Sequence, residues 1–306
     1  ALAKTDRDYT NGIKLTWSTP YRFDERNSRL PKWSYPLISR LPYVKDTTRQ
    51  RSVSFSIGQD IYTPEDLDET DLIEDDRPYA GILYLGVGFH SKKDRRKDNW
   101  EFNIGVVGPH SYAEETQNNI HDLIGSDQAN GWDNQLEDEV AIEATYEAQW
   151  RLLEARNAIG FGYDVIPHIG ARLGNVRLYV NTGAEIRLGW NLAQNFGTCP
   201  IRPGCETDST VADISVDSLS KQIQTGIHLF VAADGRVVIR DIFLDGNTIR
   251  DSHSVQKEQF VADIMGGIGV VLGKVKVSYA YVYRTKQFET QDRAQVFGSF
   301  TLSYSF

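Results

Sequence analysis

The sequence contains no apolar run long enough to cross a membrane as a helix. Its longest such run, Ile264–Leu272, is far shorter than the roughly 20 residues that a spanning helix needs, and glycines interrupt it. No Gly/Pro/Ser-rich linker divides the chain, so we expect a single domain over residues 1–306. The first residues do not resemble a signal peptide, which indicates either a mature form or a cytosolic protein.

Methionine is also scarce, and basic residues are outnumbered by acidic ones, 33 to 42. Methionine occurs once, at Met265, whereas aromatic residues are plentiful, with 15 Tyr and 6 Trp. This balance suits strands and interfacial belts better than a helical core. The net charge of −9 argues against a nucleic-acid partner and against simple electrostatic docking on anionic lipid.

Only two cysteines occur, Cys199 and Cys205, in the Pro/Gly-containing stretch TCPIRPGC. Two cysteines without CxxC spacing cannot form a closed zinc site. A small disulfide loop, worth about 2 kcal/mol by chain entropy, would indicate an oxidising compartment. Two free thiols are the alternative.

Alternating apolar and polar residues recur along almost the whole chain, which predicts β-strands. The expected strands are Tyr9–Ser18, Gln50–Tyr62, Tyr79–Lys92, Asn99–Gly108, Ile142–Ala155, Gly160–Gly174, Val176–Trp190, Thr225–Leu244, Gln259–Leu272, Lys274–Lys286 and Ala294–Phe306. Pro167 lies inside one of them, where its missing donor requires a bulge. Within Thr225–Leu244, Ala233–Gly235 could be a hairpin turn or a bulge in one long strand.

Strands of this length, apolar on one face and small or polar on the other, match those of membrane barrels. Charged residues occupy the second face in mid-strand, at Lys14, Glu143, Glu147, Arg187 and Lys276. A soluble β-sandwich permits the same alternation, but a final strand that ends in Phe306 favours an outer-membrane barrel. The fold class that we expect is therefore all-β, a transmembrane antiparallel up-and-down β-barrel.

Such barrels usually have an even number of strands, and eleven are visible if Thr225–Leu244 is one strand. We therefore expect about 12 strands, the first of them truncated or missing upstream of Ala1. If Phe306 lies at the periplasmic end, counting the strands backwards from it places Thr10 and the loops after strands two and four on the outer side. The insertion Thr19–Thr48 and the cysteine loop then lie on the periplasmic side.

One stretch, Pro109–Trp132, predicts a short extracellular loop helix. Ser111 and Glu114 have capping-box spacing, and Gly125 is placed to end the helix. The spacing puts three residues on one stripe, with Ile120 and Leu123 beside it: Gln117, His121 and Ile124. A histidine beside an amide and a carboxylate, here Asp127, could activate water because imidazole titrates near neutral pH. The alternative is a helical lid with a packed histidine.

The acidic stretch Glu65–Asp76 has eight acids in twelve residues. It lacks the glycine and terminal glutamate of an EF-hand loop, so we expect a solvated loop rather than a calcium site. No G-x-S-x-G motif occurs, so a serine esterase elbow is absent from the sequence.

Several stretches, spaced in order along the chain, together resemble the outer-membrane lipid A 3′-O-deacylase family. They are TDRDYTNG (5–12), QDIYTP (59–64), DRPYAG (76–81), GVVGP with QNNIHDLIG and GWDNQ (105–135), and FLDGN (243–247). The resemblance implies a monomeric 12-stranded barrel in the bacterial outer membrane that hydrolyses an acyloxyacyl ester of lipopolysaccharide. It also implies a calcium-dependent reaction, in which a histidine activates water and the cation polarises the ester carbonyl. A non-enzymatic barrel, a small pore or adhesin, is the alternative.

Carried over residue by residue, the resemblance places His121, Thr10 and Gln117 at the catalytic positions and Asp127 at the metal. The family's Asn-Asp pair on the first strand has no counterpart, because this chain begins after it. The acidic stretch Glu65–Asp76 occupies the loop in which the best-known member of the family has a basic stretch. Arg77 is a candidate for a substrate phosphate, with a structural pair to neighbouring acids as the alternative.

Overall fold

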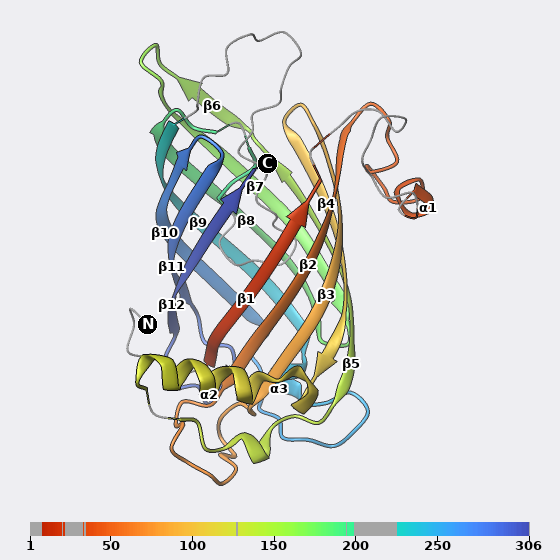
Figure 1. Cartoon of the computed structure of the whole chain (residues 1–306), viewed down its shortest axis with the longest axis vertical. Coiled ribbons are helices and arrows are strands. Elements are labelled where there is room, and N and C mark those ends of the chain that lie inside the picture. Colours follow the sequence, from red (N-terminus) through yellow and green to blue (C-terminus); the bar gives the residue numbers. More distant parts are fainter. Residues whose placement is uncertain are drawn as a thin grey trace.

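The computed structural model describes the backbone of residues 8–19, 21, 33, 35–126, 128–193, 195–198 and 225–305. Within this part, one antiparallel sheet curls into a barrel (Figure 1). Its strands are β1 (Asp8–Ser18), β2 (Gln50–Thr63), β3 (Ala80–Lys93), β4 (Arg96–Val107), β5 (Glu139–Trp150), β6 (Leu153–Arg156), β7 (Phe161–Gly174), β8 (Arg177–Trp190), β9 (Thr225–Asp241), β10 (Phe260–Leu272), β11 (Val275–Arg284) and β12 (Gln295–Tyr304). None of the described helices is long and apolar enough to cross a membrane.

Each long strand pairs with the next one along the chain, in the order β1-β2-β3-β4-β5-β7-β8-β9-β10-β11-β12, and β6 pairs with β7. This order confirms the up-and-down barrel and excludes the two separate sheets of a sandwich. Among the described residues no ladder joins β1 to β12. The expectation of one further strand stays a prediction.

The strand β9 settles the ambiguous segment, because it runs unbroken for 17 residues. Ala233–Gly235 pairs in continuous register with β10, so it is neither a turn nor a bulge. The register shift lies instead between Leu178 and Tyr179 on β8, where β9 carries the additional residue Ile239.

Pro167 is accommodated in the expected way, by a bulge in the strand beside it. β5 pairs with β7 as far as His168, and β6 resumes the pairing at Val165. Pro167 therefore faces the interruption between β5 and β6, where no ladder donor is required. Its other neighbour, Ala184 on β8, pairs without interruption.

Alternation along the strands separates two chemically different faces. Large apolar side chains point outward over half exposed, among them Leu229 at 60%, Val231 at 61% and Phe300 at 65%. Charged side chains point into the lumen and are buried, including the predicted second-face residues Glu143, Glu147, Arg187 and Lys276. An apolar exterior and a polar interior are the reverse of a soluble protein and match a membrane barrel.

The lumen charges are paired with one another. Arg187 Nε lies 2.8 Å from Asp164 Oδ1, and Arg284 Nε lies 2.7 Å from Asp263 Oδ1. Residues 195–198, which follow β8, enter this interior: the Thr198 backbone amide donates to Glu185 Oε1 at 2.9 Å. Buried charges need partners of this kind, because an unpaired one would be strongly destabilising.

At the other end, the loop after β9 folds into the barrel as the short helix α3 (Ile242–Asp245). Phe243 stacks on Tyr62 with ring centroids 4.1 Å apart. The two belong to an apolar cluster that also contains Ile82, Val107 and Leu136. Figure 1 shows α2, α3 and the acidic loop at one end of the barrel, and α1 (Tyr35–Ile38) at the opposite end. This distribution matches the expected sidedness. The cysteine pair lies outside the described residues.

The exposed wall of β9 generates a stability prediction. Val231→Arg places a charge against the lipid near the middle of the strand and should lower the free energy of unfolding in vesicles by about 2–4 kcal/mol. Ile249, 87% exposed in the loop after α3, is the matched control, and Ile249→Arg should stay within about 0.5 kcal/mol of the parent chain. Equal losses in the two variants, measured by denaturant titration, would contradict a lipid-facing wall.

Candidate functional site

The helix α2 (Ala113–Ile124) follows the short helix η2 (Pro109–Ser111) and lies across the outer face of β2 and β3 (Figure 1). Gly81 on β3 makes this contact possible, because a Cβ there would lie 2.1 Å from the Cβ of Ala113. Gln59 on β2 donates from Nε2 to the carbonyl oxygen of Ser111 at 2.7 Å. Ile61, on the outer face of β2, is buried beneath the helix together with Ala113. The helix is therefore held on the outside of the wall and not in the lumen.

The start of α2 differs from the predicted capping box. The N-cap residue is Tyr112, in the left-handed region at φ 56°, and it makes no side-chain cap. Ser111 lies one position earlier in η2, and its Oγ has no hydrogen-bond partner. The capping-box prediction is wrong because η2 precedes the helix and moves its first turn. The predicted end is confirmed: Gly125, at φ 69°, donates its backbone amide to the carbonyl of His121.

The buried stripe of α2 consists of Ala113, Gln117 and His121, each at most 2% exposed. The structure thus brings the two predicted helix residues together on the face that rests against the wall. Leu123 is 86% exposed and does not belong to the packed face. The side chain of Ile124 lies outside the description.

Trp132 determines the orientation of the Gln117 amide. In the 3-10 helix η3 (Trp132–Asn134), the indole Nε1 of Trp132 donates to Gln117 Oε1 at 3.0 Å. An indole N–H can only donate, so the amide oxygen must face Trp132 and Nε2 must face the other way. Gln117 Nε2 is buried and has no hydrogen-bond partner. A buried donor is therefore available beside His121.

Tyr79 supports Trp132 from the loop before β3. The two rings lie 5.0 Å apart and form one cluster with Ile61, Ala113 and Ala129. Burial, together with the negative charges of Asp66, Asp68 and Asp76 in the acidic loop, raises the pKa of the Tyr79 hydroxyl to about 12. Tyr79 is therefore neutral at physiological pH.

Thr10 lies at an irregularity of β1 next to this cluster. Tyr9 pairs with Tyr62 and Asn11 with Ile61, so Thr10 is the additional residue of a β-bulge. Bulges are frequent next to active sites because they redirect a side chain. The backbone therefore places Thr10 beside Ile61, the residue that α2 covers. The side chain of Thr10 and all of Asp127 lie outside the description.

Arg77 is buried, at 1% exposed, in the loop before β3. Its Nη2 donates to Gln287 Oε1 at 3.1 Å, and its guanidinium lies over the rings of Tyr62 and Phe288. The structure thus places it among the loops that cap the lumen. Its role at a substrate phosphate stays a prediction.

The acidic stretch is exposed, as expected for a solvated loop, and its carboxylates bind its own backbone. Asp76 Oδ2 accepts from the Glu65 amide at 2.7 Å, and Asp66 Oδ1 accepts from the Asp68 amide at 3.0 Å. Across the described ranges, no group of three or more His, Cys, Asp or Glu side chains could hold a metal ion. On α2, the buried Oδ1 of Asn118 has no hydrogen-bond partner.

The residues that position the helix were not singled out from the sequence. Gly81, Gln59 and Trp132 each lie in a stretch that carried the family resemblance, DRPYAG, QDIYTP and GWDNQ. The resemblance was therefore the available signal, but only the fold shows what each residue touches.

A polar-cored, apolar-walled barrel with a loop helix on its outer rim defines an outer-membrane β-barrel protein. A family model described as outer membrane protein LpxR matches residues 1–306, so the chain belongs to this family and is an outer-membrane protein. This confirms the family expected from the motifs and excludes a cytosolic location. LpxR from Salmonella typhimurium has a similar solved structure, with a TM-score of 0.70 and 19% identity over 96% of this chain and 100% of that chain. No curated protein matches.

The Trp132–Gln117 contact generates a prediction. Trp132→Phe keeps a ring against Tyr79 but leaves the buried Gln117 amide without its donor, which should lower the free energy of unfolding by about 1–3 kcal/mol. The matched control is Trp190→Phe. In the parent chain, Trp190 Nε1 donates to the carbonyl oxygen of Ile159 at 2.9 Å in an exposed position. That change should cost about 0.5 kcal/mol or less by denaturant titration. The orientation argument fails if the two variants lose the same stability.

Proposed function

We propose that this protein is a lipid A 3′-O-deacylase, which hydrolyses the 3′-linked acyloxyacyl ester of lipopolysaccharide in the outer leaflet. The observation that carries the proposal is the buried stripe of α2. His121 and Gln117 face the outer side of the barrel wall, and the family is an outer-membrane family. A site on the outside of the wall is reached from the lipid layer, whereas a lumen site would be reached from water. The substrate that suits this location is therefore a membrane lipid.

His121 is the general base in this proposal. Its imidazole takes a proton from water, and the resulting hydroxide attacks the ester carbonyl. The ester C–O bond then breaks, and the proton passes to the leaving sugar oxygen. The products are the free acyloxyacyl carboxylic acid and the 3′-hydroxyl of the sugar. A water nucleophile agrees with a sequence that contains no nucleophile elbow.

Gln117 and Thr10 complete the reacting surroundings. Gln117 Nε2, turned away from Trp132, donates a hydrogen bond to the ester oxygen that becomes negative as water adds. Thr10, on the bulge of β1, holds the water or the imidazole in place. Arg77 stays a candidate for orienting a substrate phosphate.

Calcium is the proposed cofactor, held by Asp127 and by oxygen atoms such as the orphaned Oδ1 of Asn118. When bound, it supplies a positive charge that polarises the ester carbonyl. Oxygen donors suit this hard cation, whereas thiolates select softer metals. Neither cysteine of the chain lies near α2 in the sequence, so the nearby side chains offer oxygen ligands and no thiolate.

The interior of the barrel favours the enzyme over a conducting pore. Thr198 and Asn195 are hydrogen-bonded to Glu185 and Arg187 at one end of the lumen, and Phe243 packs on Tyr62 at the other. These contacts support a function at the outer wall. A monomeric state stays a prediction.

Replacing the base tests the mechanism. In His121→Ala, release of the acyloxyacyl unit should fall by about 10²–10⁴-fold, because no other side chain takes the proton from water. The matched control is His110→Ala: His110 is exposed on the same loop and pairs with Asp138, so this variant should keep wild-type activity. Lipid A mass spectrometry from cells that make each barrel gives the readout. Unchanged release in a folded His121→Ala barrel would remove the mechanism.

Calcium is tested separately. A chelator should abolish hydrolysis by the purified protein, and added Ca²⁺ should restore it. Asp127→Asn should raise the Ca²⁺ concentration for half-maximal activity by at least about tenfold. Asp122→Asn is the control and should keep the calcium dependence of the parent. Asp122 is an exposed residue of α2 whose Oδ1 accepts a hydrogen bond from Gln128 Nε2. Full activity in chelator would exclude the cation.

A further inference from the structure

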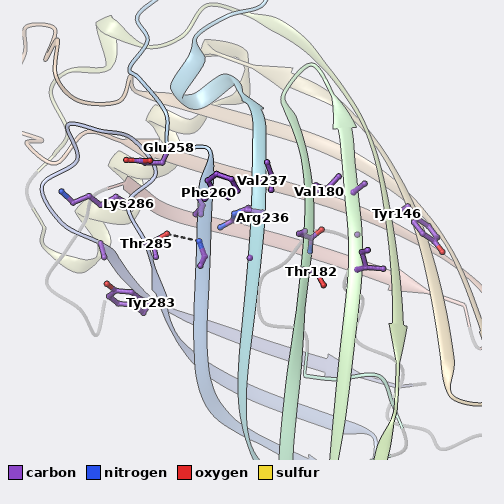
Figure 2. A pocket seen from close by; sticks show the side chains of 18 residues that line it. Tyr146, Val180, Thr182, Arg236, Val237, Glu258, Phe260, Tyr283, Thr285 and Lys286 are labelled. Carbon is purple, nitrogen blue, oxygen red and sulfur yellow. Dashed lines mark hydrogen bonds between the residues drawn. The ribbon is translucent and has the colours of Figure 1, made fainter.

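A large apolar groove lies on the outer wall and is lined by residues of β5 and of β7 to β11, whereas α2 contacts β2 and β3 (Figures 1 and 2). Its volume is about 1030 Å³, the size of a small-molecule pocket. Its sides are formed by outward-pointing apolar residues on neighbouring strands: Ile169, Val180, Val237, Phe260 and Tyr283. The groove is therefore a feature of the lipid-facing surface and not of the lumen.

The groove exists because the residues of its floor are small. Thr182 on β8 pairs with Gly235 on β9, and Gly235 pairs with Ala262 on β10, so the three form one row across the wall. The adjacent row, Val180, Val237 and Phe260, is taller and forms a ridge. A row of small side chains beside a ridge leaves a depression.

Gly235 is not required by the backbone. A Cβ at this position would meet only the carbonyl oxygen of Thr182, at 4.0 Å. At the neighbouring Gly183, in contrast, a Cβ would come within 2.0 Å of the Ala233 carbonyl oxygen. Glycine inside a strand costs stability because it adds no packing. The absence of a side chain at Gly235 keeps the floor of the groove low.

The position and charge of the groove identify its occupant. It opens into the hydrocarbon of the outer membrane, and its charged border lies by the loops at the α2 end, where Glu258 and Lys286 are found (Figure 2). Lys286 is exposed and forms no ion pair with Glu258 or any other described residue. The third charged residue of the lining, Arg236, is held by Asp263 at 2.9 Å. An apolar trough with a free cation at its loop end fits an acyl chain attached to a phosphorylated headgroup.

We infer that this groove binds an acyl chain of a second lipid A molecule, separate from the one at α2, with its phosphate at Lys286. The choice of lipid A rests on the proposed function, because that function places the α2 end in the outer leaflet. The bound lipid would anchor the wall opposite the catalytic helix.

Filling the groove tests the inference. Gly235→Leu puts a side chain into the open space above the floor. Gly266→Leu is the matched control: Gly266 also faces lipid, on β10, its Cβ would meet only the Phe230 carbonyl oxygen at 4.0 Å, and it does not line the groove. Both changes are made in full-length His121→Ala protein, so that bound lipid A is not hydrolysed.

Native mass spectrometry with purified lipid A counts the bound molecules. The parent should bind two, Gly235→Leu should bind one, with at least a tenfold loss of the second affinity, and Gly266→Leu should still bind two. Lys286→Gln should weaken the second molecule by about fivefold.

Three results would overturn the inference: equal binding by both leucine variants, equal filling of the groove by phosphatidylglycerol, or a wild-type dimer that Gly235→Leu converts into a monomer. The proposed function is tested apart from this, by hydrolysis in the chain with His121 intact. If that chain releases no acyl unit while Gly235-dependent binding persists, the enzyme proposal fails and the groove stands.

Discussion

Hydrogen bonding of the backbone is the constraint on which this structure depends. Within hydrocarbon, each unpaired peptide group costs several kcal/mol, so every strand needs a neighbour on both sides. Side chains along a strand then alternate between lipid and lumen with a period of two. Leu229 and Val231 face outward, while Phe230 between them is buried. The same constraint explains Pro167, which faces the break between β5 and β6, where no donor is needed.

The lumen is filled by charges that pair across strands. Arg187 binds Asp164, Arg284 binds Asp263, and residues 195–198 add further donors and acceptors. Such pairs specify the interior, because removal of one member leaves a buried charge without a partner. An interior committed to structure leaves the outer wall for ligands. The proposed function accordingly places the reaction on the outside of the barrel.

Glycine shapes that outer wall at two opposite places. Gly81 lets Ala113 approach the sheet, which brings His121 and Gln117 against the wall. Gly235 leaves a depression on the far side that suits a lipid chain. In both cases a missing side chain on a regular strand makes room for another group. The bulge at Thr10 is a third local departure, and it lies beside the helix that Gly81 admits.

The sequence by itself determined the strands, their faces and the residues of the loop helix, because alternation and helical spacing are local properties. It also placed Gly125 at the helix end, since only a few residues tolerate that backbone conformation. Tertiary structure decided how the helix begins, because η2 precedes it, and why Leu123 is exposed while Gln117 is buried. It alone joined Trp132 to Gln117 and Gln59 to Ser111, contacts between segments 15 and 52 residues apart. Such pairs leave no periodic trace in a sequence, because their separation depends on how the loops between them fold.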